Sequence, residues 1–218
     1  MNELLFFSQI LLVCIVVVVS YRMKMLQSCL VLCVVLANLF ALKQIEIFGI
    51  VTIPSNPIYM GIFFASNLLV EDYSKKEAKM ATWYGFFATF MTAVFGLLIV
   101  GYTPIAADFA HEAYQTLFEF VPRVTLAGIV AYALSSLLNI YCFDVLKSLW
   151  KQKMLWLRNI LTLFISQTFD TILFTYLAFY GVIDDLWSII LFSILTKIGV
   201  AIVGTPFLTF VRKYNKHT

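Results

Sequence analysis

Charged side chains are scarce in this sequence of 218 residues. Asp, Glu, Lys and Arg together make up 12% of it, against about 25% in an ordinary soluble domain. Hydrophobic residues make up 62%, and the mean hydropathy is +0.93. A water-soluble fold has no way to bury that much apolar surface, so the composition argues against a soluble protein and predicts one that lies in a lipid bilayer.

The residues and motifs of common catalytic and metal sites are also missing. The sequence has two histidines and four cysteines, and its cysteines lie in apolar runs without CxxC spacing. Such cysteines usually pack as small hydrophobic side chains. No HExxH, Walker, GxSxG or dinucleotide-binding motif is present. We therefore expect no cofactor, no metal site and no enzymatic activity, and we interpret residues 1–218 as one membrane domain.

Apolar runs fill the sequence instead, and each is long enough for a helix that crosses a hydrocarbon core about 30 Å thick, which takes roughly 20 residues. These runs predict an all-α, polytopic membrane protein with about seven transmembrane helices. The first run begins with Asn2 and Glu3 rather than a basic segment, so we expect a retained helix and not a signal peptide. The predicted spans are Leu4–Ser20, Met25–Leu42, Ile53–Val70, Met80–Gly101, Pro122–Phe143, Asn159–Tyr180 and Leu186–Val211.

The basic residues alternate between loops in a way that predicts the orientation. Lys and Arg collect on the cytoplasmic side of membrane proteins, and all but three of the 15 basic residues fall in alternate loops or at the C-terminal end. We therefore expect the N-terminus outside and the C-terminus inside. The net charge of +3 is explained by this anchoring and gives no argument for a nucleic-acid partner. The residues concerned are Arg22, Lys24, Lys75, Lys76, Lys79, Lys147, Lys151, Lys153, Arg158, Arg212, Lys213 and Lys216.

Two ionisable residues stand inside predicted spans, where each costs about 2.5 to 3.5 kcal/mol to insert. Asp170 lies near the middle of the sixth span and Lys197 near the middle of the seventh, so opposite charges occur at similar depth on consecutive helices. One interpretation is a buried structural ion pair. We favour the other, in which one or both side chains face the path of a substrate or a proton.

Further polar residues occur where helix packing alone does not require them. Gln167 lies three residues before Asp170 and shares its helix face. Arg123 and Asn139 belong to a ridge of small and polar side chains along the fifth span. Close packing explains the small members of this ridge, whereas Arg123 and Asn139 are better candidates for lining a cavity.

The segment before the third span is unusual because two prolines bracket a polar turn. It carries Gln44, Glu46 and Asn56, and Asn67 follows inside the span. The segment is either a plain external loop or a broken or re-entrant element. The second arrangement is tolerated at membrane depth only where protein or a water-filled cavity covers the backbone. It would place Asn56 and Asn67 near a binding site.

Several runs of the sequence together resemble one known family. They are Ala37–Gly49, Ala65–Glu71 and Ser166–Thr171, the last followed by the lone Lys197 in the next helix. In these runs, and over most of Leu36–Phe210, the chain resembles the queuosine precursor transporter family, also called the vitamin uptake transporter family. The resemblance implies a six-helix core preceded by one extra helix, and a homodimer, although the sequence contains no GxxxG motif.

The resemblance also implies a function. Members of that family import queuine, or cyano- or aminomethyl-deazaguanine, into bacteria across the inner membrane for tRNA modification, without an ATPase subunit of their own. A deazaguanine has two adjacent N–H donors, which suit the Asp170 carboxylate, and a carbonyl that suits an amide. Lys197 would keep Asp170 ionised, and Phe63, Phe169 or Tyr132 would stack on the ring. The predicted substrate-binding residues are Asp170, Lys197, Gln167, Asn67, Asn56, Gln44, Glu46, Arg123 and Asn139.

Three other functions compete with this one. A substrate-capture subunit of an energy-coupling-factor transporter would co-purify with ATPase subunits. A seven-helix photoreceptor would use Lys197 for a retinal Schiff base, but the carboxylate stands on the sixth span and position 193, one turn before the lysine, is a serine. An intramembrane enzyme is disfavoured because no pairing of nucleophile and base stands out.

Overall fold

The structure is a computed structural model of the 218-residue chain. It describes residues 1–40, 43, 45–118, 122–150 and 153–181. Beyond these it describes residues 186, 187, 190, 191, 193–195, 197–199 and 202. The side chains of residues 50–52, 122–125 and 179 lie outside this description.

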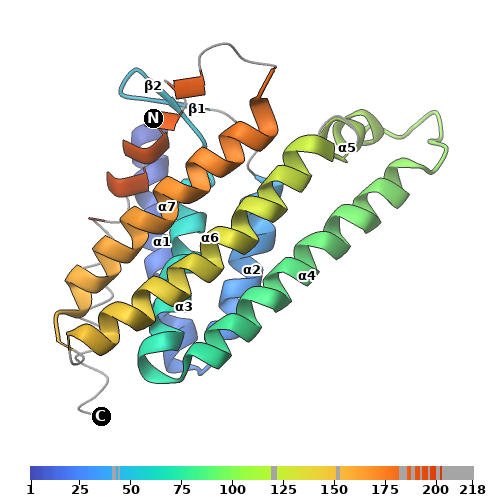
Figure 1. Cartoon of the computed structure of the whole chain (residues 1–218). Helices are drawn as coiled ribbons and strands as arrows, with labels where there is room; N and C mark the ends of the chain where they lie inside the picture. The colour runs from blue at the N-terminus through green and yellow to red at the C-terminus, as the bar shows by residue number, and fades with distance from the viewer. Residues whose placement is uncertain are drawn as a thin grey trace.

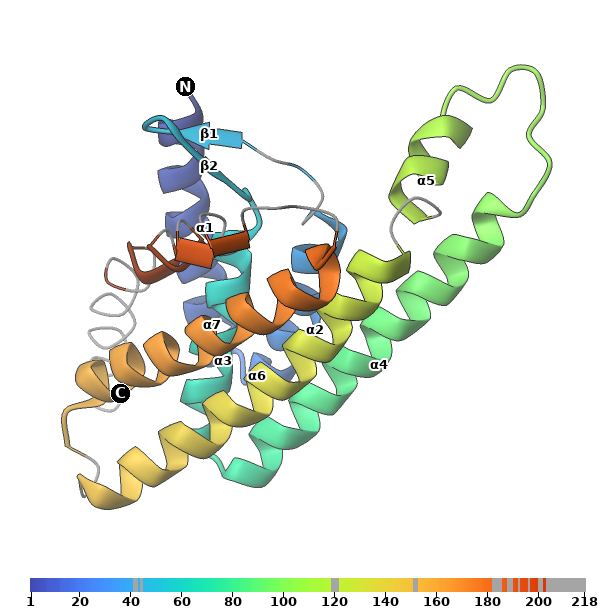
Figure 2. The ribbon, with the colours of Figure 1, turned by 45° about the horizontal axis from the view of Figure 1, so that its top comes forward.

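Seven helices and one short hairpin have defined bounds in the described residues, and the described residues between 186 and 202 are also helical (Figure 1). The hairpin strands pair antiparallel with Glu46 opposite Val51. Figure 2 shows the hairpin beside the start of α1, and α5 near the end of α4. The elements are α1 (Asn2–Arg22), α2 (Leu26–Leu39), β1 (Ile45–Ile47), β2 (Ile50–Thr52), α3 (Asn56–Asp72), α4 (Lys75–Val100), α5 (His111–Phe118), α6 (Pro122–Leu149) and α7 (Leu155–Phe179).

Helix α3 is the centre of the bundle. It packs against α1, α2, α4, α6 and α7, and all of its residues except Tyr59 and Asp72 are buried. A helix that is apolar around its whole circumference is stable only when other helices surround it. Pro57 in the first turn fixes a helical φ where no N–H partner is required, which favours the start of the helix at this point.

The turn from α3 to α4 is set by local sequence. Ser74 is the N-cap of α4, and its side-chain oxygen accepts a hydrogen bond of 3.1 Å from the backbone N–H of Glu77. Ser-x-x-Glu is the capping-box pattern, which satisfies donors that the first turn of a helix leaves unpaired. Because α4 starts at Lys75, directly after this cap, the chain reverses sharply at the end of α3 (Figure 1).

The all-α membrane fold predicted from the sequence is confirmed. Within the described residues, four helical segments are long and apolar enough to cross a bilayer, and α2 is a shorter apolar helix. Large apolar side chains such as Leu5 on α1 and Phe95 on α4 are 60% exposed, as expected of surfaces that face lipid. The four segments are Asn2–Arg22, Lys75–Val100, Leu126–Leu149 and Leu155–Ala178.

Several details differ from the predicted spans. The seventh span, 186–211, lies mostly outside the described residues, so the count of seven and the orientation stay predictions. The third span starts at Asn56 rather than Ile53, because the residues before it form the β1–β2 hairpin and a turn. The hairpin and α5 both lie between the predicted spans, where the sequence analysis predicted no element. Asn2 Nδ2 donates to the Glu46 carbonyl at 3.1 Å, which places the hairpin beside the start of α1.

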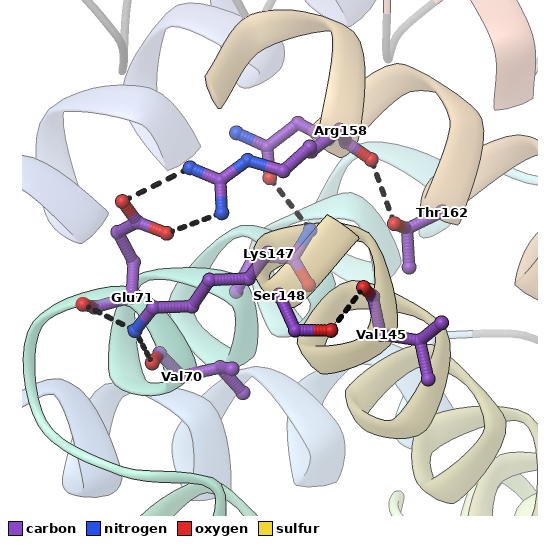
Figure 3. A network of polar contacts seen from close by, with 9 residues as sticks. Val70, Glu71, Val145, Lys147, Ser148, Arg158 and Thr162 are labelled. Carbon is purple, nitrogen blue, oxygen red and sulfur yellow. Dashed lines mark hydrogen bonds and ion pairs between the residues drawn. The ribbon is translucent and has the colours of Figure 1, made fainter. Parts of the chain in front are cut away.

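A buried ion pair joins α3 and α7 near the turns between α3 and α4 and between α6 and α7 (Figure 3). The Arg158 guanidinium makes contacts of 2.8 and 3.0 Å to the two carboxylate oxygens of Glu71, and both side chains are at most 1% exposed. Lys147 of α6 donates to the carbonyls of Val70 and Glu71 at 2.7 and 2.8 Å. Its charge is favourable there because it meets the negative end of the α3 dipole. These contacts fasten three helices at one end of the bundle.

Removal of Glu71 should therefore destabilise the protein strongly. Glu71→Ala leaves the buried Arg158 charge without its carboxylate, which costs about 3 to 5 kcal/mol. Lys75→Ala is the matched control, because the Lys75–Asp144 pair of 3.1 Å is 31% and 40% exposed and such pairs contribute about 0 to 1 kcal/mol. Thermal unfolding of the purified protein in detergent measures both. Equal losses in the two variants would contradict a dominant role for the buried pair.

Candidate functional site

Asp170 and Lys197, the two charges that the sequence places inside spans, form an ion pair. Lys197 Nζ lies 2.8 Å from Asp170 Oδ2, and the two side chains are 9% and 6% exposed. Lys197 also donates to Thr171 Oγ1 at 3.1 Å, and Ser135 of α6 donates to Asp170 Oδ1 at 2.9 Å. The Lys197 ammonium stands 5.4 Å from the ring centroid of Tyr59 on α3. The pair therefore connects α3, α6 and α7 with the helical residues around 197.

This ion pair borders a cavity of about 110 Å³ between the helices. That volume has room for several water molecules. Residues of α2, α3, α4, α5, α6 and α7 line the cavity, and hydroxyl, amide and charged groups are spread over its wall. The polar lining residues are Asn38, Ser55, Asn56, Tyr59, Thr89, Thr92, Asp170, Thr171, Thr175, Ser193 and Lys197.

Three of the predicted site residues, Asp170, Lys197 and Asn56, line this cavity together. The aromatic residues in the described part of its wall are Tyr59, Phe118 and Phe174, instead of those expected from the sequence. Of the latter, Phe63 and Tyr132 are buried in the packed core and Phe169 is exposed, and none of them lines the cavity.

Helical periodicity could have identified two of the three aromatic residues in the cavity wall. Tyr59 is three residues after Asn56 and Phe174 is four after Asp170, so each shares a helix face with a residue already singled out. Phe118 was not singled out because it lies on α5, a short helix between two of the predicted spans.

Asn67 and Asn139 are brought together elsewhere, in a buried network between α3, α6 and α7. Asn139 Nδ2 donates to Asn67 Oδ1 and to Ser66 Oγ, each at 2.8 Å. Asn67 Nδ2 donates in turn to Asn159 Oδ1 at 2.6 Å, and Ser166 Oγ donates to Asn139 Oδ1 at 3.3 Å. All five side chains are buried. None of them lines the cavity, so in this structure they bind one another.

The remaining predicted residues lie apart from the Asp170 cavity. Gln167 is buried and borders a second cavity. Glu46 is exposed on β1, away from the cavity wall. Gln44 and the side chain of Arg123 lie outside the described residues. No group of three or more His, Cys, Asp or Glu residues suited to a metal ion occurs in the described part of the chain.

The arrangement defines a multi-pass helical membrane protein that holds a charged, partly aromatic cavity between its helices. Such a cavity is suited to bind a small polar molecule. The ammonium and carboxylate supply a donor and an acceptor, the hydroxyl groups supply both, and the aromatic rings supply flat apolar surface.

Comparison with known proteins identifies the family. Residues 55–211 match the family model described as "Putative vitamin uptake transporter", which is more than half of the chain. The chain therefore belongs to the vitamin uptake transporter family, as its sequence predicted, and is a transporter rather than an enzyme.

A curated relative has a more specific name. The "Probable queuosine precursor transporter" of Bacillus subtilis (strain 168) is 35% identical over 185 residues, which cover 82% of this chain and 80% of that protein. No solved structure matches the chain.

The asparagine network should contribute to stability and not to substrate binding. Asn139→Ala leaves Asn67 and Ser66 without their buried donor, which costs about 1 to 3 kcal/mol. The control Ser148→Ala removes only an exposed hydroxyl that bonds to the Val145 carbonyl, so its effect should stay within about 0.5 kcal/mol. Thermal unfolding measures the cost. Uptake per folded molecule should stay near the wild-type value, and its complete loss would instead place Asn139 in the binding site.

Proposed function

We propose that this protein imports queuosine precursors, that is queuine or cyano- or aminomethyl-deazaguanine, across the bacterial inner membrane for use in tRNA modification. The observation that carries this proposal is the Asp170–Lys197 pair at the wall of a cavity among apolar helices. The name of the Bacillus subtilis relative supports the substrate class.

A buried ion pair gives the protein little or no stability beyond that of an apolar pair of similar volume, so its presence calls for a functional explanation. Replacing a buried ion pair by apolar residues of similar volume is often neutral or stabilising by about 1 to 4 kcal/mol. Stability alone is therefore a weak reason for two charges at this depth. Because the pair lies on a cavity surface, recognition of a polar substrate is the better explanation for it.

The bonding capacity of Asp170 fits a deazaguanine. A carboxylate has about four acceptor positions, and the hydrogen bonds to Asp170 in the described structure come from Lys197 and Ser135. The remaining positions suit the two adjacent N–H donors of the base. Asp170 can therefore accept from the substrate while it keeps its contacts to the protein.

Donors for the carbonyl of the base are present in the same cavity wall. The Lys197 ammonium has three N–H donors, of which the described contacts use two, toward Asp170 and Thr171. The third donor, or the side-chain amide of Asn56, suits the carbonyl. The wall thus offers complementary groups to both the donors and the acceptor of a deazaguanine.

Aromatic side chains supply the remaining contact. Tyr59 and Phe174 line the same cavity as Asp170 and Lys197. Their rings offer flat apolar surface, on which a heterocyclic base packs favourably in an offset or edge-to-face arrangement. Polar groups for the edge of the base and aromatic groups for its faces therefore occur together.

The membrane location is part of the same proposal. A bacterial inner membrane agrees with the Bacillus subtilis relative and with the alternation of basic loops. The homodimer that the family resemblance implies stays a prediction.

Uptake by charge-neutral variants tests the proposed function. Asp170→Asn combined with Lys197→Met removes both charges, so no unpaired buried charge remains to unfold the protein. We expect this double variant to insert normally and to lose uptake of radiolabelled queuine and of both smaller precursors. The assay uses cells that lack their own precursor synthesis and transport.

The single variants and a control complete the experiment. Asp170→Asn and Lys197→Ala should also lose uptake, whereas Lys75→Ala, at the exposed pair, should keep it. Wild-type uptake in the double variant would contradict a role for the ion pair. Absence of uptake by correctly inserted wild-type protein would contradict the substrate class, and co-purification with ATPase subunits would favour a substrate-capture subunit.

A further inference from the structure

Helix α5 forms one side of the Asp170 cavity, although little of its own surface is buried. Its last two residues, Leu117 and Phe118, belong to the cavity wall. None of the eight residues of α5 is buried, and the helix packs against α4 at the edge of the bundle (Figure 2). The other helices of the wall pack against one another. A segment with few buried contacts opens at a lower free energy than a packed core helix.

Phe118 of α5 packs directly on a glycine of α4. Gly96 is buried, and a Cβ atom added to it would stand 2.7 Å from Phe118 Cγ and closer still to Cδ1 and Cε1 of the same ring. Any larger residue at position 96 would therefore displace the ring. Gly96 follows Ala93, which lines the cavity, by three residues, so the two share one helix face. The ring thus covers the cavity face of α4 near the end of that helix.

We propose that α5 is a gate on the outer side of the Asp170 cavity, and that Phe118 closes it by packing on Gly96. The inference rests on the proposed function, because the gate controls the path by which the base reaches the Asp170–Lys197 pair. In the predicted orientation α4 ends on the outer side of the membrane. The gate therefore faces the compartment from which an imported base arrives.

A contact between an aromatic ring and a glycine is suited to a gate. Phe118 has no polar group in its side chain, so opening breaks no hydrogen bond or ion pair of that side chain. The side chain is only partly buried, so opening exposes little additional apolar surface. Tyr114, one turn earlier on α5, stacks on Phe118 with 6.3 Å between the ring centroids and moves with it. The gate can therefore open by a movement of α5 while the Asp170–Lys197 pair keeps its contacts.

Access to the cavity from outside tests the gate without any substrate. In a variant without its native cysteines, Thr89→Cys places a thiol of similar size in the cavity wall, at a position that is 3% exposed. A membrane-impermeant maleimide added to intact cells should label this thiol slowly. Phe118→Ala removes the ring and Gly96→Ala displaces it. Each should speed labelling roughly tenfold, because partial burial of a Phe side chain no longer favours the closed gate.

Two matched controls carry the same substitutions away from the gate. Phe109→Ala changes a side chain that is 98% exposed in the loop before α5. Gly101→Ala adds a Cβ atom at the end of α4 that makes ordinary contacts of 3.4 and 3.6 Å to backbone oxygens. Both controls should leave the labelling rate of Thr89→Cys unchanged. Equal rates in all four variants would overturn the gate, as would fast labelling of Thr89→Cys with the gate residues intact.

A disulfide across the gate tests its role in uptake. Gly96→Cys and Phe118→Cys together place one thiol on α4 and one on α5. Phe118 Cβ is bonded to the Cγ that lies 2.7 Å from a Cβ at position 96, so the two Cβ atoms fall near the disulfide spacing of about 3.5 to 4.5 Å. Oxidation of this double variant should reduce uptake of radiolabelled queuine and of both smaller precursors to background, and reduction should restore it. The two single-cysteine variants should not respond to the oxidant.

The outcomes separate this inference from the proposed function. Uptake that continues after the disulfide has formed would overturn the gate and leave import intact. Absence of uptake of every precursor by correctly inserted wild-type protein would contradict the proposed function. The labelling rates of Thr89→Cys would then still decide whether α5 closes the cavity, because that measurement needs no substrate.

Discussion

Every polar group inside the bundle must find its partner within the protein or in the contents of a cavity, because lipid offers none. This constraint explains the pairing of Arg158 with Glu71 and of Lys197 with Asp170. The asparagine network between α3, α6 and α7 meets the same requirement without charge. These polar contacts determine how the other helices pack around α3. Apolar contacts between helices give little directional preference, because lipid tails are as apolar as the side chains.

The sequence was most informative at residues whose insertion into the bilayer costs free energy. Asp170 and Lys197 stood out because each charge is expensive alone, and the structure brings the two into contact. The family was also predicted correctly. The expectation that Asn67 and Asn139 lie near the substrate stays a prediction, and the structure shows that the two bind each other. Periodicity identifies a helix face without identifying the neighbouring helix, so this contact depended on tertiary structure.

Other features of the fold were not predicted from the sequence. The β1–β2 hairpin has strands of three residues each, too short for an alternating pattern to show. Helix α5 lies outside the apolar runs, so its contribution of Phe118 to the cavity was not foreseen. Gln167 was singled out for its place beside Asp170, yet only the packing reveals that it borders a different cavity.

The shortness of α2 has an electrical consequence. Its 14 residues span roughly 21 Å, less than a hydrocarbon core of about 30 Å. α2 ends, and α3 begins, beside the cavity that holds the ion pair. In the predicted orientation this end faces outward, so the insulating layer is thinner on that side. In that orientation the transmembrane voltage would fall mainly between the cavity and the cytoplasm, and a charged substrate would experience it chiefly on the inner part of its path.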